Sequence, residues 1–325
     1  MVKKPRAAAP RLTVDARLAQ LAAMERGDAA VDAAVVKDAL AAKVGVVVAA
    51  AARLVGAGGL DALIELLPAA FARLVDGGVE RDPGCRGKIA IARALEQLDR
   101  WDDGVFTVGV RLVQAEPVWG GREDSGAELR AVCAMAYAHT YRPDVLDVLA
   151  DLLADPERMA RVGAATALGD AGHPDATALL RYKVRVGDPE PEVIAACLGS
   201  LLALAPERSL PLVAGLLDER DDDRAAAAAL ALGESKRASV APLLIGWCER
   251  TTAALRARVG YVALAMLRDA AAVDHLLEVV ATAGKPDALA AIAALAPYAA
   301  EPRLAERLRA AAAAHRDPAV RAAAP

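Results

Sequence analysis

The sequence predicts an all-α fold in which helical hairpins stack side by side, with a repeat length of about 33 residues. Two observations carry this prediction: Asp-Pro pairs and apolar doublets both return along the chain at nearly that spacing. The composition agrees, because 56% of the residues are hydrophobic, only 3% are aromatic, and alanine is abundant. Alanine has the highest helix propensity, and its small side chain lets neighbouring helices approach closely.

The first marker is the Asp-Pro pair, which stands at residues 82–83, 155–156 and 188–189. The last two pairs lie one repeat length apart, and a further step of the same length leads to Asp221 in the acidic run Asp218–Asp223. An Asp at the N-cap accepts backbone N–H groups, and Pro suits the first helical position because its missing donor is not needed there. We therefore predict a helix start at each marker and interpret the acidic run as a helix cap rather than a cation site.

The second marker is an apolar doublet, which we place in the second helix of each hairpin. The doublets stand at 179–180, 212–213, 243–244 and 276–277, so each step between them is close to the repeat length. The first helices show helical periodicity, as in the stripe Val193, Ile194, Cys197, Leu198, Leu201 and Leu202. We expect about seven or eight hairpins, with clear ones beginning near residues 84, 125, 155, 188, 220, 252 and 285.

Residues 155–180, with the sequence DPERMARVGAATALGDAGHPDATALL, resemble a HEAT-like repeat of the phycobilisome-lyase type. The shared features are Asp-Pro, Arg-Val, paired alanines and Ala-Leu-Gly before a second helix. The residues DPAVRAAA near the end of the sequence resemble the opening of one further repeat. The resemblance covers most of residues 80–325 and implies a right-handed α-α superhelix, a HEAT-like solenoid of the armadillo-like kind. Such repeats serve scaffolds, lyases, glycosylases and regulators alike.

Three parts of the chain are expected. Residues 1–11 are basic and lack an apolar core, which predicts a disordered tail rather than a signal peptide. Residues 81–325 form the predicted repeat array. Between these parts, residues 12–80 form a less regular helical unit, with helices expected near 12–26, 31–56 and 58–76.

Charge, hydropathy and cysteines narrow the compartment and the class of partner. The net charge of −4 gives the chain no overall attraction to nucleic acid or anionic lipid. The longest apolar run, residues 44–54, contains Arg53 and is too short to span a bilayer, so no membrane partner is expected. The four cysteines lie far apart without a CxxC pair, which favours a reduced, cytoplasmic compartment.

Residues 116–125 form an insertion that lengthens one connection and places Trp119 between Pro117 and two glycines. Long connections in a compact array are often functional, so Trp119 and Arg122 are candidates for a recognition loop. The alternative interpretation is that Trp119 folds back and fills a gap between repeats. The insertion runs into Ser125-Gly-Ala-Glu128, a capping-box pattern that predicts the start of the next helix.

The sequence contains no convincing catalytic or metal-binding constellation. The four histidines, at 139, 173, 275 and 315, share no ligand spacing. Cys85 follows an Asp-Pro pair, and a thiol at a helix N-terminus can be reactive, but a buried structural cysteine is the alternative. The glycines at 56, 58 and 59 follow the run Val44–Val48 but form an incomplete dinucleotide fingerprint, and we interpret them as an inter-helix turn. We predict no catalytic residues, no metal and no cofactor.

The predicted function is that of a non-enzymatic scaffold or adaptor, which binds a protein partner on a concave face made of second helices. Arg181, Tyr182 and Arg185 on one second helix are candidate partner-binding residues, together with Trp119 and Arg122. The alternatives that the repeat type suggests are a nucleic-acid-binding or DNA glycosylase-type module and a bilin lyase-like enzyme.

Nucleic acid is not the expected partner, because a groove that follows a phosphate backbone needs basic residues repeated along the array. Steps of the doublet spacing from Arg185 lead to Asp218 and then to Glu249. The basic stripe therefore does not continue, and the interpretation as a protein-binding scaffold is preferred.

Overall fold

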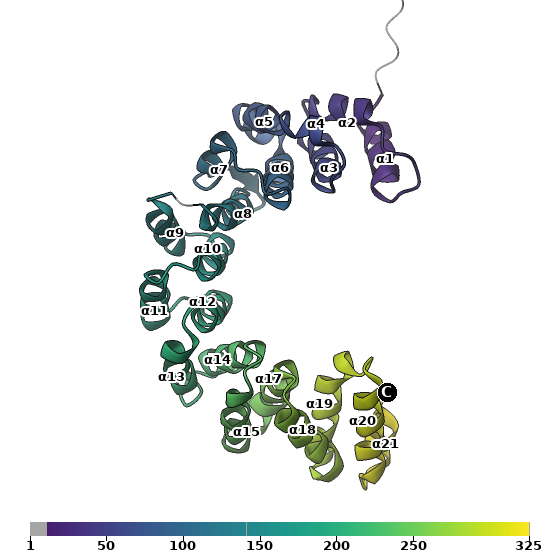
Figure 1. Cartoon of the computed structure of the whole chain (residues 1–325), viewed down its shortest axis with the longest axis vertical. Coiled ribbons are helices and arrows are strands. Elements are labelled where there is room, and N and C mark those ends of the chain that lie inside the picture. Colours follow the sequence, from purple (N-terminus) through teal and green to yellow (C-terminus); the bar gives the residue numbers. More distant parts are fainter. Residues whose placement is uncertain (1–11, 141, 325) are drawn as a thin grey trace, which may run out of the picture. The chain divides into compact units, whose positions relative to one another are not determined.

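A computed structural model describes residues 12–140 and 142–324, and the predicted tail at residues 1–11 lies outside them. The chain divides into two compact units, Met1–Ala164 (unit 1) and Ala165–Pro325 (unit 2). Both units are built of paired helices, as predicted (Figure 1), and the strands of the described residues form one small hairpin in unit 1. No described helix has the length and apolar character that crossing a membrane requires.

The N-terminal part of unit 1 is more broken than predicted. The helix near residues 12–26 is present, but residues 31–56 form two helices rather than one, because the chain leaves the helix before Val44, which has extended backbone angles. The helix expected at 58–76 is also divided, and Pro68 stands in the first turn of its second part. The elements are α1 (Val14–Glu25), α2 (Ala33–Leu40), α3 (Gly45–Gly56), α4 (Asp61–Ile64) and α5 (Leu67–Arg81). Val46, Val47 and Val48 are helical, Gly56 ends the same helix, and Gly58 and Gly59 with positive φ form the turn after it, as interpreted.

The remainder of unit 1 contains regular hairpins and an insertion that is not a loop. A 3-10 turn, η1 (Pro83–Cys85), leads into α6 (Arg86–Gln97) and α7 (Asp103–Gly109), and the next hairpin consists of α8 (Ala127–Ala138) and α9 (Val145–Leu153). Between α7 and α8 lie two antiparallel strands, β1 (Ala115–Val118) and β2 (Gly121–Asp124). The loop predicted for residues 116–125 is therefore a β-hairpin.

Unit 2 continues the alternation of first and second helices. The helix α10 (Arg158–Asp170) spans the division between the units, and all later elements lie in unit 2: α11 (Ala176–Val186), α12 (Pro191–Leu204), α13 (Pro206–Leu216), α14 (Asp222–Glu234), α15 (Ala241–Arg250), α16 (Ala253–Leu255), α17 (Tyr261–Leu267), α18 (Ala270–Thr282), α19 (Lys285–Leu295), α20 (Pro302–Ala314) and α21 (Pro318–Ala323). The four apolar doublets lie in α11, α13, α15 and α18, all of them second helices, as predicted. From α6 onward the described residues contain seven hairpins, within the predicted number, and α21 opens one more.

The Asp markers precede helix starts, but not all of them are N-caps. The carboxylates of Asp221 and Asp317 accept backbone N–H groups in the first turns of α14 and α21, as predicted. Asp188 instead accepts the N–H of Glu190 at 2.9 Å, and α12 begins only at Pro191. The N-cap prediction for Asp188 is wrong because its carboxylate forms a turn within the loop, and Glu190, two residues later, is the N-cap of α12.

First helices approach one another closely because glycines face the neighbouring helix. A Cβ at Gly169 would lie 2.4 Å from the Ser200 hydroxyl oxygen, and a Cβ at Gly233 would lie 2.4 Å from the carbonyl oxygen of Ala263. Second helices are spaced more widely, since α13 packs mainly against α12 and α14 rather than against α11 or α15. A stack with one closely spaced row bends toward that row.

The bend places the first helices of unit 2 on its inner side, where Figure 1 shows α12, α14, α17 and α19 in one row. The second helices α11, α13, α15 and α18 lie on the outer side of the same unit. For unit 2 the prediction that second helices form the concave face is therefore wrong, because the closely packed first helices form the inner row.

Candidate partner-binding sites

The β-hairpin of unit 1 ends in a two-residue turn that displays Trp119. The register pairs Val118 with Gly121, so Trp119 and Gly120 alone form the turn. Gly120 has φ 93°, a region that residues with a side chain rarely adopt, whereas Trp119 keeps a negative φ. A positive φ at only the second central position is the pattern of a type II turn, which requires glycine there.

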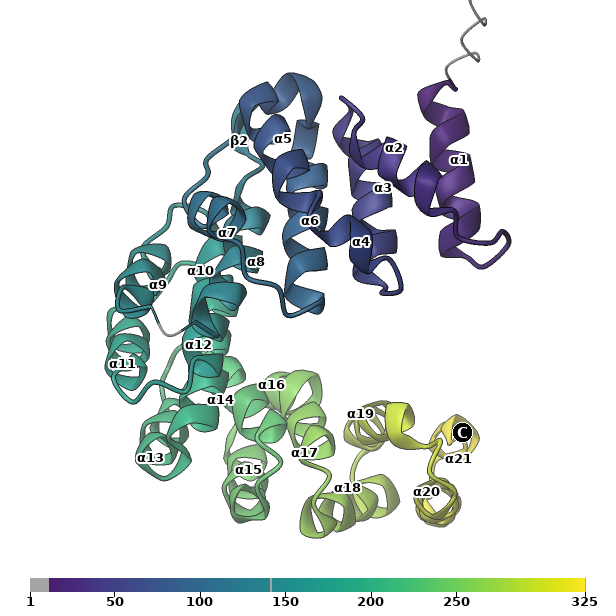
Figure 2. The same ribbon diagram turned by 45° about the horizontal axis from the view of Figure 1, so that its top comes forward.

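A polar network holds the base of the hairpin against the turn before α6. The side-chain amide of Gln114 donates to the carbonyl oxygen of Asp82 at 2.9 Å and to the carboxylate of Glu116 at 2.8 Å. The carboxylate of Glu116 also accepts the N–H of Gly84 at 2.7 Å and the hydroxyl of Ser125. These bonds reach Asp82, which follows α5, and Gly84 of η1, and Figure 2 draws β2 on the side of unit 1 where α5 lies.

Arg130 anchors the other side of the hairpin base. Its guanidinium binds Asp155 through two bonds of 2.8 Å, and it binds Asp124 of β2 at 2.7 Å and the carbonyl oxygen of Leu112 at 2.9 Å. The Arg130 side chain is only 2% exposed, so these are buried, charge-assisted contacts. The hairpin is thereby tied to α8 and to the turn before α10.

The two carboxylates at the hairpin base are held in their ionised forms. Partial burial raises the pKa of Asp124, but the hydrogen bonds from the backbone N–H of Gln114 and from Arg130 outweigh burial and lower that pKa below its ordinary value. Burial likewise raises the pKa of Glu116, and the bonds from Ser125, Gln114 and the N–H of Gly84 lower it overall. Both residues therefore carry negative charge at neutral pH.

Trp119 itself extends into solvent, with a relative exposure of 104%, and Val118 and Pro117 beside it are also exposed. The structure thus decides between the two interpretations of its position: Trp119 does not fill a gap between repeats. Arg122 is exposed as well, and its guanidinium donates to the carbonyl oxygen of Ala115 at 2.8 Å. A large apolar side chain on a fixed base is the arrangement of an interface anchor, and a role for Trp119 in binding stays a prediction.

The capping box predicted at the start of α8 is wrong. Gly126 is the N-cap and receives no side-chain cap. Ser125 instead bonds to Glu116 of the hairpin, and Glu128 pairs with Arg93 of α6 at 2.6 Å. Both side chains are drawn away from the helix end by partners that lie far from them in sequence.

Cys85 is a buried structural cysteine. It is fully buried at the end of η1, its backbone has φ 51°, and burial raises the pKa of its thiol above the ordinary value despite the nearby Ser125 hydroxyl. Beside it, Asp82 and Lys88 form an ion pair of 2.9 Å between two fully buried side chains. The carboxylate of Asp82 also accepts the N–H groups of Gly87 and Lys88, so this marker caps α6 across the η1 turn.

The candidate residues of α11 form a second exposed face, in unit 2. Tyr182 is 70% exposed, and Val186, one turn later, is also exposed. Arg185 is exposed, whereas the guanidinium of Arg181 donates to the carbonyl oxygen of Arg208 at 3.3 Å. Arg181 is therefore partly engaged in linking α11 to α13, and Tyr182 and Arg185 are the more accessible members of the set.

A groove of about 820 Å³ crosses the first-helix side of unit 1, a feature that the sequence did not reveal. Its floor is made of alanines on α3 and α6, among them Ala49, Ala90 and Ala94. Two ion pairs bridge neighbouring helices along it: Arg53 with Glu25 at 2.8 Å, and Arg93 with Glu128 at 2.6 Å. Every lining residue lies on α1, α3, α6 or α8 or in the segments beside them, so the groove belongs to unit 1 alone.

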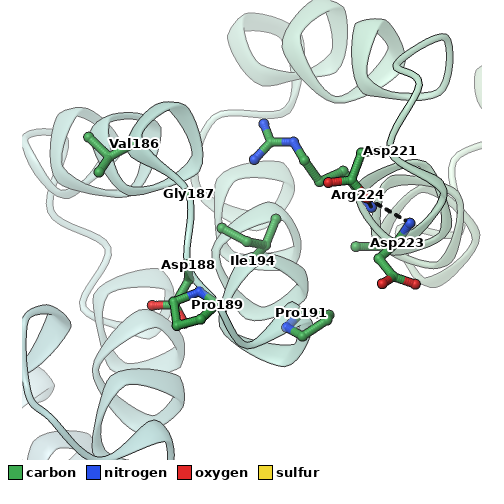
Figure 3. A pocket seen from close by; sticks show the side chains of 10 residues that line it. Val186, Gly187, Asp188, Pro189, Pro191, Ile194, Asp221, Asp223 and Arg224 are labelled. Atoms are coloured by element: carbon green, nitrogen blue, oxygen red, sulfur yellow. Dashed lines mark hydrogen bonds between the residues drawn. The ribbon is translucent and has the colours of Figure 1, made fainter.

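A hollow of about 450 Å³ in unit 2 lies between the loop after α11 and the start of α14 (Figure 3). Two of its acidic groups hold the fold: Asp188 pairs with Lys183 at 2.8 Å, and Asp221 caps α14. Arg224 binds Glu219 at 2.7 Å and the carbonyl oxygen of Val184 at 3.2 Å. The acidic run is thus a structural cap, in agreement with its interpretation from the sequence.

Comparison with protein families supports the repeat. A family model described as HEAT repeats matches residues 121–185 and, overlapping with them, residues 160–233. A search of curated proteins found no match. The matched residues run from β2 through α14 and contain four of the seven hairpins in part or whole. The likeness to the phycobilisome-lyase type of repeat stays a prediction.

Proposed function

We propose that this chain, in which residues 121–233 are HEAT repeats, is a non-enzymatic scaffold that binds a protein partner through the Trp119 hairpin. The observation that carries the proposal is the position of Trp119, fully exposed at the end of a hairpin whose base is buried and charge-paired. Tryptophan is enriched among the few residues that supply most of the binding energy in protein interfaces. Exposure of its large apolar area to water is unfavourable, and a partner that covers the ring removes that cost.

The anchoring of the hairpin supports the proposal on energetic grounds. Binding costs free energy when flexible segments become ordered, and a segment that is already fixed avoids much of that cost. Four guanidinium bonds from Arg130 and the bonds around Glu116 fix the hairpin base before any partner arrives. The hairpin is therefore pre-organised, unlike a free loop that carries a tryptophan.

The burial of the thiols argues against a function based on thiol chemistry. All four cysteines are buried and free, and burial raises the pKa of Cys197 and of Cys248 to about 12. Free thiols also fit the reduced cytoplasmic compartment that we propose for the protein. The alanine-floored groove of unit 1 offers the same partner a second contact area.

The test is affinity capture with matched variants of the full chain. We expect a partner that the wild-type protein captures and that Trp119→Ala fails to capture, while Val31→Ala, a change at another exposed apolar residue of unit 1, captures it normally. Tyr182→Ala shows whether α11 contributes to the same interaction. Equal capture by the wild type and Trp119→Ala would remove the support for the proposal.

A further inference from the structure

The two edges of the β-hairpin differ in the backbone groups that they offer. The N–H of Ser125 donates to the carbonyl oxygen of Gln114 at 3.0 Å, which fixes the phase of the antiparallel ladder. Hydrogen-bonded and non-hydrogen-bonded pairs alternate along such a ladder. The pair of Glu116 with Glu123 is therefore hydrogen-bonded, and the backbone groups of Arg122 and Asp124 point outward from β2.

The outer edge of β1 is blocked. Its outward-facing residues are Ala115 and Pro117, which lie opposite Asp124 and Arg122 in the register. Pro117 has no N–H to donate, and the carbonyl oxygen of Ala115 already accepts the guanidinium of Arg122. Proline and capped carbonyl groups are devices that prevent a further strand from pairing.

The outer edge of β2 carries no such block. Among the hydrogen bonds of the described residues, none outside the hairpin uses the backbone N–H or C=O of Arg122 or Asp124. Residues 121–123 are exposed, and a Cβ at Gly121 would meet no atom within 4 Å. The edge therefore presents two outward donors and two outward acceptors, those of exposed Arg122 and of half-buried Asp124.

We propose that β2 is a docking edge, to which an extended peptide segment of the partner adds as a third strand. The inference rests on the proposed function and names the form of the partner: a strand rather than a helix. Strand addition obtains affinity from main-chain hydrogen bonds and specificity from alternate side chains. Trp119 at the end of the hairpin covers the added segment.

Charge on one face of the hairpin defines the chemistry of that segment. Glu116 and Glu123 are directly opposite each other, so their carboxylates lie on the same face, and Glu116 is held in its ionised form. A peptide residue paired beside Glu123 meets this negative charge, which selects Lys or Arg. Two positions along, the residue beside Gly121 lies in open space next to exposed Val118, which selects an aliphatic side chain.

The test selects peptides from a phage library of random dodecapeptides on the full chain. We expect enriched sequences with Lys or Arg two positions from Val, Ile or Leu. The affinities of the synthetic peptides are then measured by fluorescence anisotropy. Arg122→Pro removes the outward N–H, and we expect at least a tenfold loss of affinity. Arg122→Ala removes only the side chain, and we expect less than a threefold loss.

Proline at position 122 suits the fold because Pro117 already occupies the opposite, non-hydrogen-bonded position. A second measurement keeps the test independent of that variant: the peptide is N-methylated at alternate residues in two sets and bound to wild-type protein. In an added strand, alternate N–H groups point toward β2 and away from it. Strand addition therefore predicts that N-methylation of one set of residues abolishes binding and that N-methylation of the other set leaves binding intact. Loss with both sets or with neither, equal effects of the two Arg122 variants, or a failure to enrich any peptide would overturn the inference.

The outcome separates this inference from the proposed function. If a captured partner requires Trp119 but binds the Arg122→Pro variant with the same affinity as the wild type, the hairpin is an anchor and strand addition is wrong. If no captured protein depends on Trp119, the proposed function itself fails.

Discussion

Arg130 and Asp155 form a bidentate ion pair, with both N–O distances 2.8 Å, inside unit 1. Asp155 belongs to one of the Asp-Pro markers that define the repeat, and Arg130 also binds Asp124 at the hairpin base. One buried guanidinium therefore links the regular repeat to its most irregular insertion. The position of Trp119 depends on this link.

Arg130→Gln is predicted to destabilise the protein by about 3 kcal/mol, because it leaves two nearly buried carboxylates without their cation. The measurement is the free energy of unfolding in urea. Arg250→Gln is the control, since Arg250 pairs with Asp218 at the surface and such pairs contribute at most about 1 kcal/mol. Equal effects of the two variants would show that the Arg130 contacts do not hold the fold.

Gly45→Ala is predicted to destabilise the protein by about 2 kcal/mol through overpacking, because the new Cβ would lie 2.0 Å from the carboxylate of buried Asp82. Gly199→Ala is the matched control within a helix: its Cβ would meet no atom within 4 Å, and we expect it to stabilise the protein by about 0.5 kcal/mol or more. Thermal unfolding midpoints of both variants provide the test. A stable Gly45→Ala protein would contradict the close approach of α3 to Asp82.

The regular part of this fold could be predicted because its signals repeat. The stripe from Val193 to Leu202 and the second residue of each doublet are buried where the period places them, since each hairpin packs against a copy of itself. The first doublet residues are less regular, and Leu243 is exposed. The single helix predicted for residues 31–56 failed for the opposite reason. Gly45 must meet Asp82, which lies far from it along the chain, and no local pattern reports such a contact.

The hairpin could not be predicted from its own residues. Glu, Pro, Gly and Asp are all rare in strands, so residues 115–124 carry little β propensity. Their structure is set by long-range bonds, such as those from Gln114 to Asp82 and from Gly84 to Glu116. The buried position of Arg130 could not be predicted either, because a charged residue on a helix is usually at the surface. Trp119 was a candidate from the sequence, but the sequence left open whether it fills a gap or faces solvent, and the structure shows it exposed beyond the turn at Gly120.

The stabilising effect of Asp124 is predicted to disappear in acid. The pKa of Asp124 in the folded protein lies below its ordinary value of 3.8, so the unfolded chain takes up a proton there before the folded chain does. The stability that Asp124 contributes is thus complete above that ordinary value and is lost as the pH falls through the lower, folded value. We expect Asp124→Asn to be less stable than wild type at pH ~7, and the gap in unfolding free energy to narrow toward pH ~3. A gap that stays constant with pH would contradict the ionised contact.

The cysteines are predicted to resist modification in the folded protein. All four thiols are buried, and burial raises the pKa of Cys85 above its ordinary value, so few thiolates are available to react. A maleimide reagent at pH ~7.5 should modify none of them in the native protein and all of them in urea. Rapid modification of Cys85 in the native protein would revive the reactive-thiol interpretation.

The most direct test of the scaffold proposal is photo-crosslinking from the hairpin tip in living cells. The photoreactive residue p-benzoylphenylalanine replaces Trp119 in one variant and Val31, an exposed residue elsewhere in unit 1, in the other. We predict a discrete crosslinked protein from position 119 that is missing from position 31. Crosslinking that is the same at both positions, or none at position 119, would contradict a partner-binding role for Trp119.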